Sequence, residues 1–151
     1  MSLTDTRVVP RFGMQALTNE PLTVQGDGSQ RRTMCFVDDI LNGFELVITR
    51  GTAGHVYNLG SDQSLTIMEL ARSIIRLTDS QSAIVSVPRP AHDHSRRMPD
   101  LAKIAQLGWH QTVSLDDGLR RTIDYFKSLV PGCASESTDN AAPALETLPA
   151  H

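Results

Sequence analysis

The chain has 151 residues, which is enough for one domain of ordinary size. With 40% hydrophobic and 21% charged residues, its composition is that of a globular protein and excludes wholesale disorder, collagen and a coiled coil. The net charge of −3 comes from residues 131–151, which contain carboxylates and neither lysine nor arginine. The rest of the chain is neutral, so it lacks the positive charge on which nucleic-acid binding depends.

The sequence also argues against a membrane protein and a metal site. No apolar run approaches the roughly 18 residues of a membrane span, and the N-terminus lacks the apolar core of a signal peptide. The two cysteines, Cys35 and Cys133, form no CxxC motif, and His92 and His94 have no third ligand at metal spacing. We therefore expect a cytoplasmic protein that contacts no membrane and holds no metal.

The first predicted elements are a helix and two strands. Apolar spacing predicts a helix over residues 8–19, and a short strand follows at 21–24. The glycine-containing turn 26–29 leads into a β-rich run, 31–37. We expect the two strands to pair as a hairpin.

Asp38 is suited to cap the next helix, 39–50, whose apolar residues recur at helical spacing. A short, mostly apolar strand is predicted at 55–60. Thr66 and Glu69 then form a capping box that opens the following helix. The later elements are a helix at 67–77, a strand at 83–87 and helices at 101–108 and 114–129, the last opened by Ser114.

The alternation of single strands with helices predicts an α/β fold, with parallel pairing where a helix crosses over. The strands are short, so we expect a small sheet with flanking helices that resembles part of a larger sheet. All predicted elements lie in residues 1–130. Residues 131–151 are rich in Pro, Ala, Ser and Thr without periodicity, and we expect a disordered acidic tail.

The segment GDGSQRR, residues 26–32, is a candidate phosphate site. It combines two glycines, a hydroxyl and two arginines, and arginine offers a planar fork that matches phosphate oxygens. The alternative is a hairpin turn followed by solvated arginines. Arg96 and Arg97 form a second candidate, because open α/β sheets bind ligands at strand ends.

The residues give no sign of autonomous catalysis. The chain has no GxSxG, Walker or HExxH motif. The carboxylate pair Asp38 and Asp39 is interpreted as a cap and a partner of the helix dipole. We therefore predict no catalytic residue.

Three stretches in chain order carry a family resemblance. They are RVVPRFGMQALTNEPLTVQGDGSQRRTMCFVDDILNG (7–43), VYNLGSDQSLTIMELA (56–71) and RRMPDLAKIAQLGWHQTVSLDDGLRRTIDYF (96–126). Together they resemble the NAD-dependent epimerase/dehydratase family, the extended short-chain dehydrogenases. Within that family they are most similar to the UDP-glucuronate decarboxylase branch.

The resemblance implies the C-terminal, substrate-binding portion of such an enzyme, with the Rossmann core mostly absent. The family's GxxGxxG motif and YxxxK pair do not occur here, and Met1 matches an internal family position. We therefore expect a fragment that is inactive alone. NAD is the cofactor of the intact family enzymes, and this chain alone is not expected to bind it.

The implied ligand is a UDP-sugar or a related nucleotide sugar. Arg32 matches the family arginine that grips the diphosphate, and either Arg96 or Arg97 matches a second one. Arg31 could add a third positive group, and Arg11 stands where asparagine is common. The residues matching the segment against the nucleobase and ribose are Pro21, Leu22, Val24 and Gln25, and an aromatic residue is common at the last of these positions.

The resemblance leaves alternatives open within the family and outside it. Within it, the chain could derive from a dTDP-glucose 4,6-dehydratase or a UDP-glucose 4-epimerase. A hypothesis outside the enzyme class is a non-catalytic nucleotide-sugar-binding module, or a subunit that completes a separately encoded Rossmann half. An inert gene remnant is a further alternative.

Overall fold

The computed structural model describes residues 7–88 and 98–130. The first elements of this part are α1 (Val8–Leu17), β1 (Leu22–Gln25), β2 (Arg31–Thr33) and α2 (Val37–Arg50). They are followed by β3 (Ser64–Thr66), α3 (Ile67–Thr78), β4 (Ile84–Val87), α4 (Ala102–Ala105) and α5 (Leu115–Leu129). The expected α/β class is confirmed.

The strands form two separate pairs. β1 and β4 pair in parallel with Leu22 opposite Ile84, whereas β2 and β3 pair antiparallel with Arg32 opposite Leu65. The predicted parallel pairing across a helix is therefore confirmed. The predicted hairpin is wrong, because β1 and β2 each find a partner that lies more than 30 residues away in sequence rather than each other.

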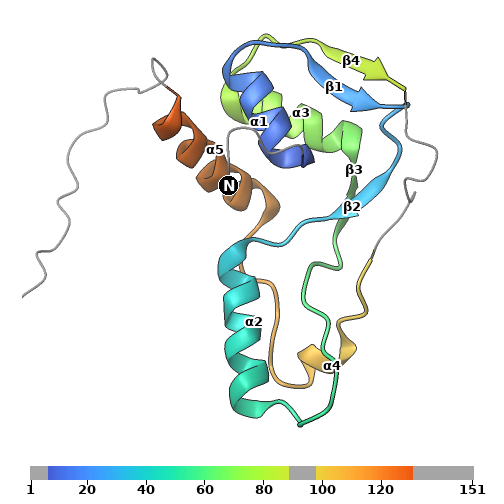
Figure 1. Cartoon of the computed structure of the whole chain (residues 1–151), viewed down its shortest axis with the longest axis vertical. Helices are drawn as coiled ribbons and strands as arrows, with labels where there is room; N and C mark the ends of the chain where they lie inside the picture. The colour runs from blue at the N-terminus through green and yellow to red at the C-terminus, as the bar shows by residue number, and fades with distance from the viewer. Residues whose placement is uncertain (1–6, 89–97, 131–151) are drawn as a thin grey trace, which may run out of the picture.

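The molecule divides into a body and an arm (Figure 1). The body contains α1, α3, α5 and the β1–β4 pair, and its core combines one side of α1 and α3 with the inner face of β1. Phe12, Leu22, Leu70 and Ile74 are fully buried there. The arm contains α2, α4 and the connecting segments 51–61 and 106–113, and β2 and β3 lie between arm and body.

The helix starts follow local chemistry. Thr66 Oγ1 accepts from Glu69 N at 3.1 Å, and Thr66 N donates to the Glu69 carboxylate at 2.7 Å, so the predicted capping box is confirmed. Ser114 Oγ likewise accepts from Asp117 N at 3.1 Å and caps α5. α4 is shorter than the predicted helix 101–108 because tighter bonds follow it, from Leu107 N to Ile104 O at 3.0 Å and from Gly108 N to Ala105 O at 2.9 Å, before the chain turns at Gly108.

Asp38 does not cap α2. The helix begins at Val37 with Phe36 at the N-cap position, so Asp38 lies inside the first turn and accepts from Arg121 Nη1 at 3.1 Å. The first-turn position agrees with its interpretation as a dipole partner.

Asp39 is buried and ties α2 to the segment before α5. Its carboxylate accepts from Thr112 N at 3.0 Å, Thr112 Oγ1 at 2.6 Å and Val113 N at 3.0 Å. Trp109 Nε1 donates to the Asp39 carbonyl oxygen at 2.8 Å. Burial alone raises the pKa of this carboxyl, but the hydrogen bonds outweigh it and the net pKa is lowered.

Residues 55–60 are not a strand, contrary to the prediction. A strand needs a neighbour for its backbone groups, and none pairs with this segment within the described part of the chain. Side chains hold it instead: Tyr57 Oη accepts from Thr52 N, and Asn58 Nδ2 donates to the Asp100 carbonyl oxygen, both at 3.0 Å. Val56 is left 76% exposed.

Candidate functional site

A cleft of about 410 Å³ lies between the start of α1, the end of β1, β2 and the start of α3. Three arginines from different positions of the chain line it, namely Arg7, Arg11 and Arg32. Two amides, Gln25 and Gln30, and several apolar side chains complete the wall. We call it the arginine cleft.

α1 supplies two of the three arginines. Arg7 is its N-cap residue and Arg11 follows one turn later, so both side chains lie on the same face of the helix. The helix N-terminus adds a favourable potential for negative charge.

Arg11 is partly buried. Its Nη2 donates to the Thr23 carbonyl oxygen at 3.2 Å, and its guanidinium carbon lies 5.4 Å from the centre of the Phe12 ring. Its Nε is buried without a hydrogen-bond partner among the described residues. Burial lowers the pKa of Arg11, so an anion in the cleft would favour its charged form.

The glycine turn positions β2 against β1 and α3. Gly28 has φ +72°, and a Cβ there would lie 2.9 Å from Val24 Cγ1 and 3.1 Å from Met68 Cβ. Gln30 is buried, and its Nε2 donates to the Gln25 carbonyl oxygen at 2.9 Å. The glycine is therefore needed for packing against β1 and α3, and the turn delivers Arg32 to the cleft.

Neighbouring residues of β2 point to opposite sides. Arg32 lines the cleft, and its Nη1 donates to the Arg31 carbonyl oxygen at 3.0 Å. Arg31 instead donates from Nε to Ser64 Oγ at 2.9 Å and from Nη2 to the Ser64 carbonyl oxygen. Arg31 therefore supports β3 and is not among the described residues that line the cleft, so its role as a third positive group stays a prediction.

The other predicted ligand-binding residues are distributed unevenly. Gln25, the last residue of β1, lines the cleft, whereas the side chains of Leu22 and Val24 belong to the core. Pro21 comes just before the first residue of β1 and is exposed. Arg96 and Arg97 lie outside the described residues, as do His92, His94 and the tail 131–151. The structure thus brings Arg32 and Gln25 together.

Arg7 was not among the predicted ligand-binding residues. Its spacing of four residues from Arg11, at the start of a predicted helix, is the signal that could have identified both as one pair.

The arginine cleft is suited to a ligand with several anionic oxygens. None of the described residues that line it is acidic, and arginine donates to phosphate oxygens in a fixed planar geometry. Its volume is in the range of small-molecule sites. The cleft residues that can donate to anionic oxygens are Arg7, Arg11 and Arg32.

NAD finds no matching site in the described residues. A dinucleotide site needs a glycine-rich turn between a strand and a helix N-terminus, but the turn with Gly26 and Gly28 leads into β2. In the same part of the chain, no cluster of three or more His, Cys, Asp or Glu side chains could hold a metal ion. Within residues 7–88 and 98–130, no helix has the length and apolar character needed to cross a bilayer.

Comparison with known proteins gives one family. Residues 2–60 match the family model described as NAD dependent epimerase/dehydratase. UDP-glucuronic acid decarboxylase 1 of Danio rerio is 42% identical over 127 residues, which are 83% of this chain and 30% of that protein. The chain spans 30% to 34% of the length of the UDP-glucuronic acid decarboxylases it matches, and 18% of a trifunctional UDP-glucose 4,6-dehydratase of Arabidopsis thaliana.

Solved structures that resemble this chain include an epimerase and a related enzyme. UDP-glucose 4-epimerase from Thermotoga maritima, crystallised with UDP-glucose, has a TM-score of 0.78 at 29% identity over 82% of this chain and 40% of its own. The Bordetella bronchiseptica enzyme WbmF, in complex with NAD+ and UDP, has a TM-score of 0.72 at 35% identity over 81% of this chain and 37% of its own.

Proposed function

Because this chain belongs to the NAD-dependent epimerase/dehydratase family, we propose that it binds a nucleotide sugar and holds the pyrophosphate in the arginine cleft. The observation that carries the proposal is the convergence of Arg7, Arg11 and Arg32 on one cleft, in which no lining residue within 7–88 or 98–130 is acidic. Gln25, at the end of β1, then lies on the side of the nucleobase.

Calorimetric titration with UDP tests this binding. We expect the chain to bind UDP, and Arg32→Ala to weaken binding by about tenfold or more, since a charge-assisted hydrogen bond contributes about 1.5–3 kcal/mol. Arg120→Ala is the matched control, because Arg120 is exposed on α5 and does not line the cleft. Equal losses in both variants, or no binding of UDP, would overturn the proposal.

The finer proposal concerns the reaction. We propose that the chain is the substrate-binding part of an enzyme like UDP-glucuronate decarboxylase, whose NAD-dependent chemistry is supplied by a part that these residues do not provide. The curated decarboxylase relatives support it, and a dTDP-glucose dehydratase or UDP-glucose epimerase is the alternative. The purified chain, given NAD and UDP-glucuronate, should release no carbon dioxide, and measurable release would contradict this.

A second candidate function is a non-catalytic subunit that completes a separate Rossmann half. It is favoured by the exposed side of α2, where Leu41, Phe44 and Ile48 are 59%, 55% and 82% exposed, and by the unpaired segment 55–60 beside it. Apolar patches of this kind commonly mark interfaces.

Co-expression tests the subunit. The chain is produced together with the N-terminal remainder of the Danio rerio relative. We expect a stable complex that Phe44→Glu disrupts, while the affinity of the chain for UDP stays unchanged. A chain that remains monomeric in the presence of this half would contradict the subunit and leave the arginine cleft unaffected.

A further inference from the structure

The exposed apolar side chains of α2 form a single stripe along the helix. They are Val37, Leu41, Phe44 and Ile48, and more than half of the surface of each is open to solvent. Their spacing alternates between four and three residues, which is the a/d pattern of a coiled-coil seam. A helix that covers a core or a sheet presents a wider apolar face than this. We call these four residues the α2 stripe.

The opposite side of α2 is already occupied. The buried Asp39 carboxylate accepts hydrogen bonds from Thr112, and a Cβ at Gly43 would collide with Leu59. These contacts fix the helix in the arm by one side, and Figure 1 shows α2 at the outer edge of the arm. The α2 stripe therefore faces away from the residues that hold the helix.

Charged side chains border the α2 stripe on one flank. Asp38 and Glu45 each come one position after a stripe residue and are seven residues apart, so they lie on the same flank. Arg121 of α5 reaches this flank, and its Nη1 lies 3.1 Å from Asp38 Oδ2. Glu45 has no ion-pair partner within residues 7–88 and 98–130. The flank thus carries an arginine near the helix start and an unpaired carboxylate two turns later.

We propose that the α2 stripe binds the α2 stripe of a second copy of this chain, with the two helices antiparallel. A two-fold contact of this kind sets Leu41 against Phe44 of the second copy, and the reverse. Because the same flank of both helices then meets, Arg121 faces Glu45 of the second copy, twice in the dimer. A parallel pair would instead oppose the charged flank to the flank that contains Val47, and it would align the two helix dipoles.

The small size of the contact sets its strength. Covering the α2 stripe on both copies removes on the order of 1,000 Å² from water, which is near the lower limit for a specific interface. We therefore expect a dissociation constant of about 10–100 μM. None of the stripe residues lines the arginine cleft, so dimerisation and nucleotide binding are expected to be independent. A separate Rossmann half would compete for the same stripe, and the test therefore uses the chain alone.

Sedimentation equilibrium of the full chain tests the dimer, from about 1 to 500 μM, a range that includes the expected constant. The unmodified chain should change reversibly from monomer to dimer. Phe44→Glu should weaken the dimer more than about a hundredfold, because a substitution in a two-fold interface acts twice. Val56→Glu is the matched control, since Val56 is also an exposed apolar residue but lies outside α2, and it should leave the dimer unchanged.

Reversal of charge tests the direction of the helices. Glu45→Arg should weaken the dimer about tenfold at low salt, because it sets two arginines against each other twice, and Arg121→Glu should weaken it similarly. The double variant should recover the affinity of the unmodified chain, because the ion pair is then reversed rather than broken. An unchanged circular dichroism spectrum reports that each variant is folded.

A chain that stays monomeric over this range, or that forms larger species without a dimer, would overturn the proposal. Equal losses in Phe44→Glu and Val56→Glu would overturn it as well, because the association would then not depend on the α2 stripe. A double variant that dimerises no better than the single variants would contradict the antiparallel contact. The affinity for UDP does not enter these outcomes, so the proposed function is tested separately.

Discussion

The body and the arm use their apolar side chains in different ways. In the body, α1, α3 and β1 bury theirs against one another, and Leu70 and Ile74 of α3 are fully buried. Along α2 in the arm, one side packs closely, since a Cβ at Gly43 would lie 2.2 Å from Leu59 Cδ2. The other side leaves Leu41 and Ile48 mostly exposed. The body thus buries most of its large apolar side chains in one core, whereas α2 in the arm leaves several of its own exposed.

The largest expected effect tests this contrast with one substitution made at two leucines. Leu70→Ala in the body should lower the free energy of unfolding by about 2–5 kcal/mol, because it leaves a cavity in a packed core. Leu41→Ala in the arm should change it by no more than about 0.5 kcal/mol, because Leu41 is 59% exposed. Urea unfolding measures both, and equal losses would show that the arm is packed as tightly as the body.

Two glycines with positive φ give the next comparison. Gly28→Ala in the body combines backbone strain with the 2.9 Å approach to Val24, and should cost about 2–4 kcal/mol. Gly54→Ala in the arm has similar strain, at φ +77°, but no atom within 4 Å, and should cost about 1–2 kcal/mol. The difference between the losses of unfolding free energy in the two variants isolates the contribution of packing at the turn of Gly28. No difference would mean that the turn can move away from α3.

Asp39 tests the polar link within the arm. Asp39→Asn should cost about 1–3 kcal/mol at neutral pH, because one buried carboxylate serves three donors. Folding lowers the pKa of this group, so its stabilisation is fully present above the ordinary aspartate value of about 3.9 and is lost as the pH falls through the folded pKa. The gap between the two proteins should therefore narrow in acid, and a gap that widens would contradict the assignment.

The smallest effect concerns helix starts. Thr66→Ala removes the side-chain cap of α3 in the body and should cost about 1 kcal/mol by thermal or urea unfolding. In the arm, α2 begins after Phe36, which offers no side-chain cap and packs against Gly118 instead. A loss below about 0.5 kcal/mol for Thr66→Ala would show that the Thr66 side chain does not stabilise the start of α3.

Helix caps could be predicted from the sequence because they depend on neighbouring residues. Which strand pairs with which could not be predicted. The capping box of Thr66 and Glu69 lies within four residues and could be predicted. β1 pairs with β4, about sixty residues later, and no local signal distinguishes that pairing from a hairpin with β2. Residues 55–60 have a strand-like pattern, but the pattern does not provide a neighbouring strand.

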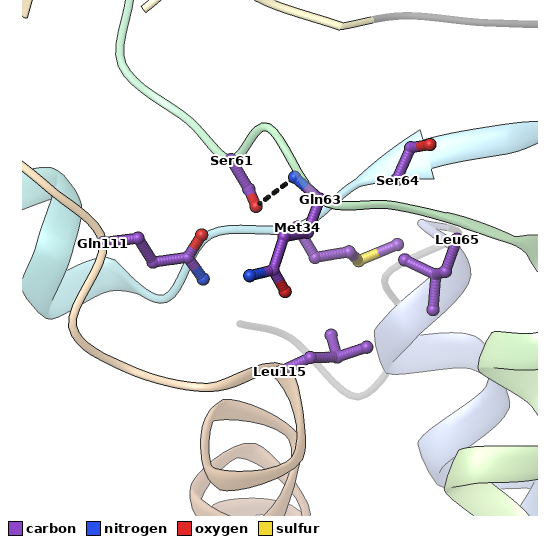
Figure 2. A pocket seen from close by; sticks show the side chains of 7 residues that line it. All are labelled: Met34, Ser61, Gln63, Ser64, Leu65, Gln111 and Leu115. Carbon is purple, nitrogen blue, oxygen red and sulfur yellow. Dashed lines mark hydrogen bonds between the residues drawn. The ribbon is translucent and has the colours of Figure 1, made fainter.

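The same distinction applies to the site. The resemblance identified Arg32, and strand alternation could have separated it from Arg31, because successive side chains of a strand point to opposite faces. A pocket of about 130 Å³ that Gln63 and Gln111 both line (Figure 2) could not be predicted, since no local pattern joins two residues so far apart in the sequence. Arg96 and Arg97 remain a prediction.

The antiparallel pair of β2 and β3 also bears on how this protein can vary. Residues 34–63 depart beside Thr33 and return beside Ser64, which are register partners. Within this excursion residues 52–54 are exposed, and no atom lies within 4 Å of a Cβ built at Gly54. Insertions and deletions among homologues should therefore accumulate at this turn, because doubling the length of a flexible loop costs only about 0.6 kcal/mol, whereas α2 and the hydrogen bonds of Asp39 fix the rest of the excursion.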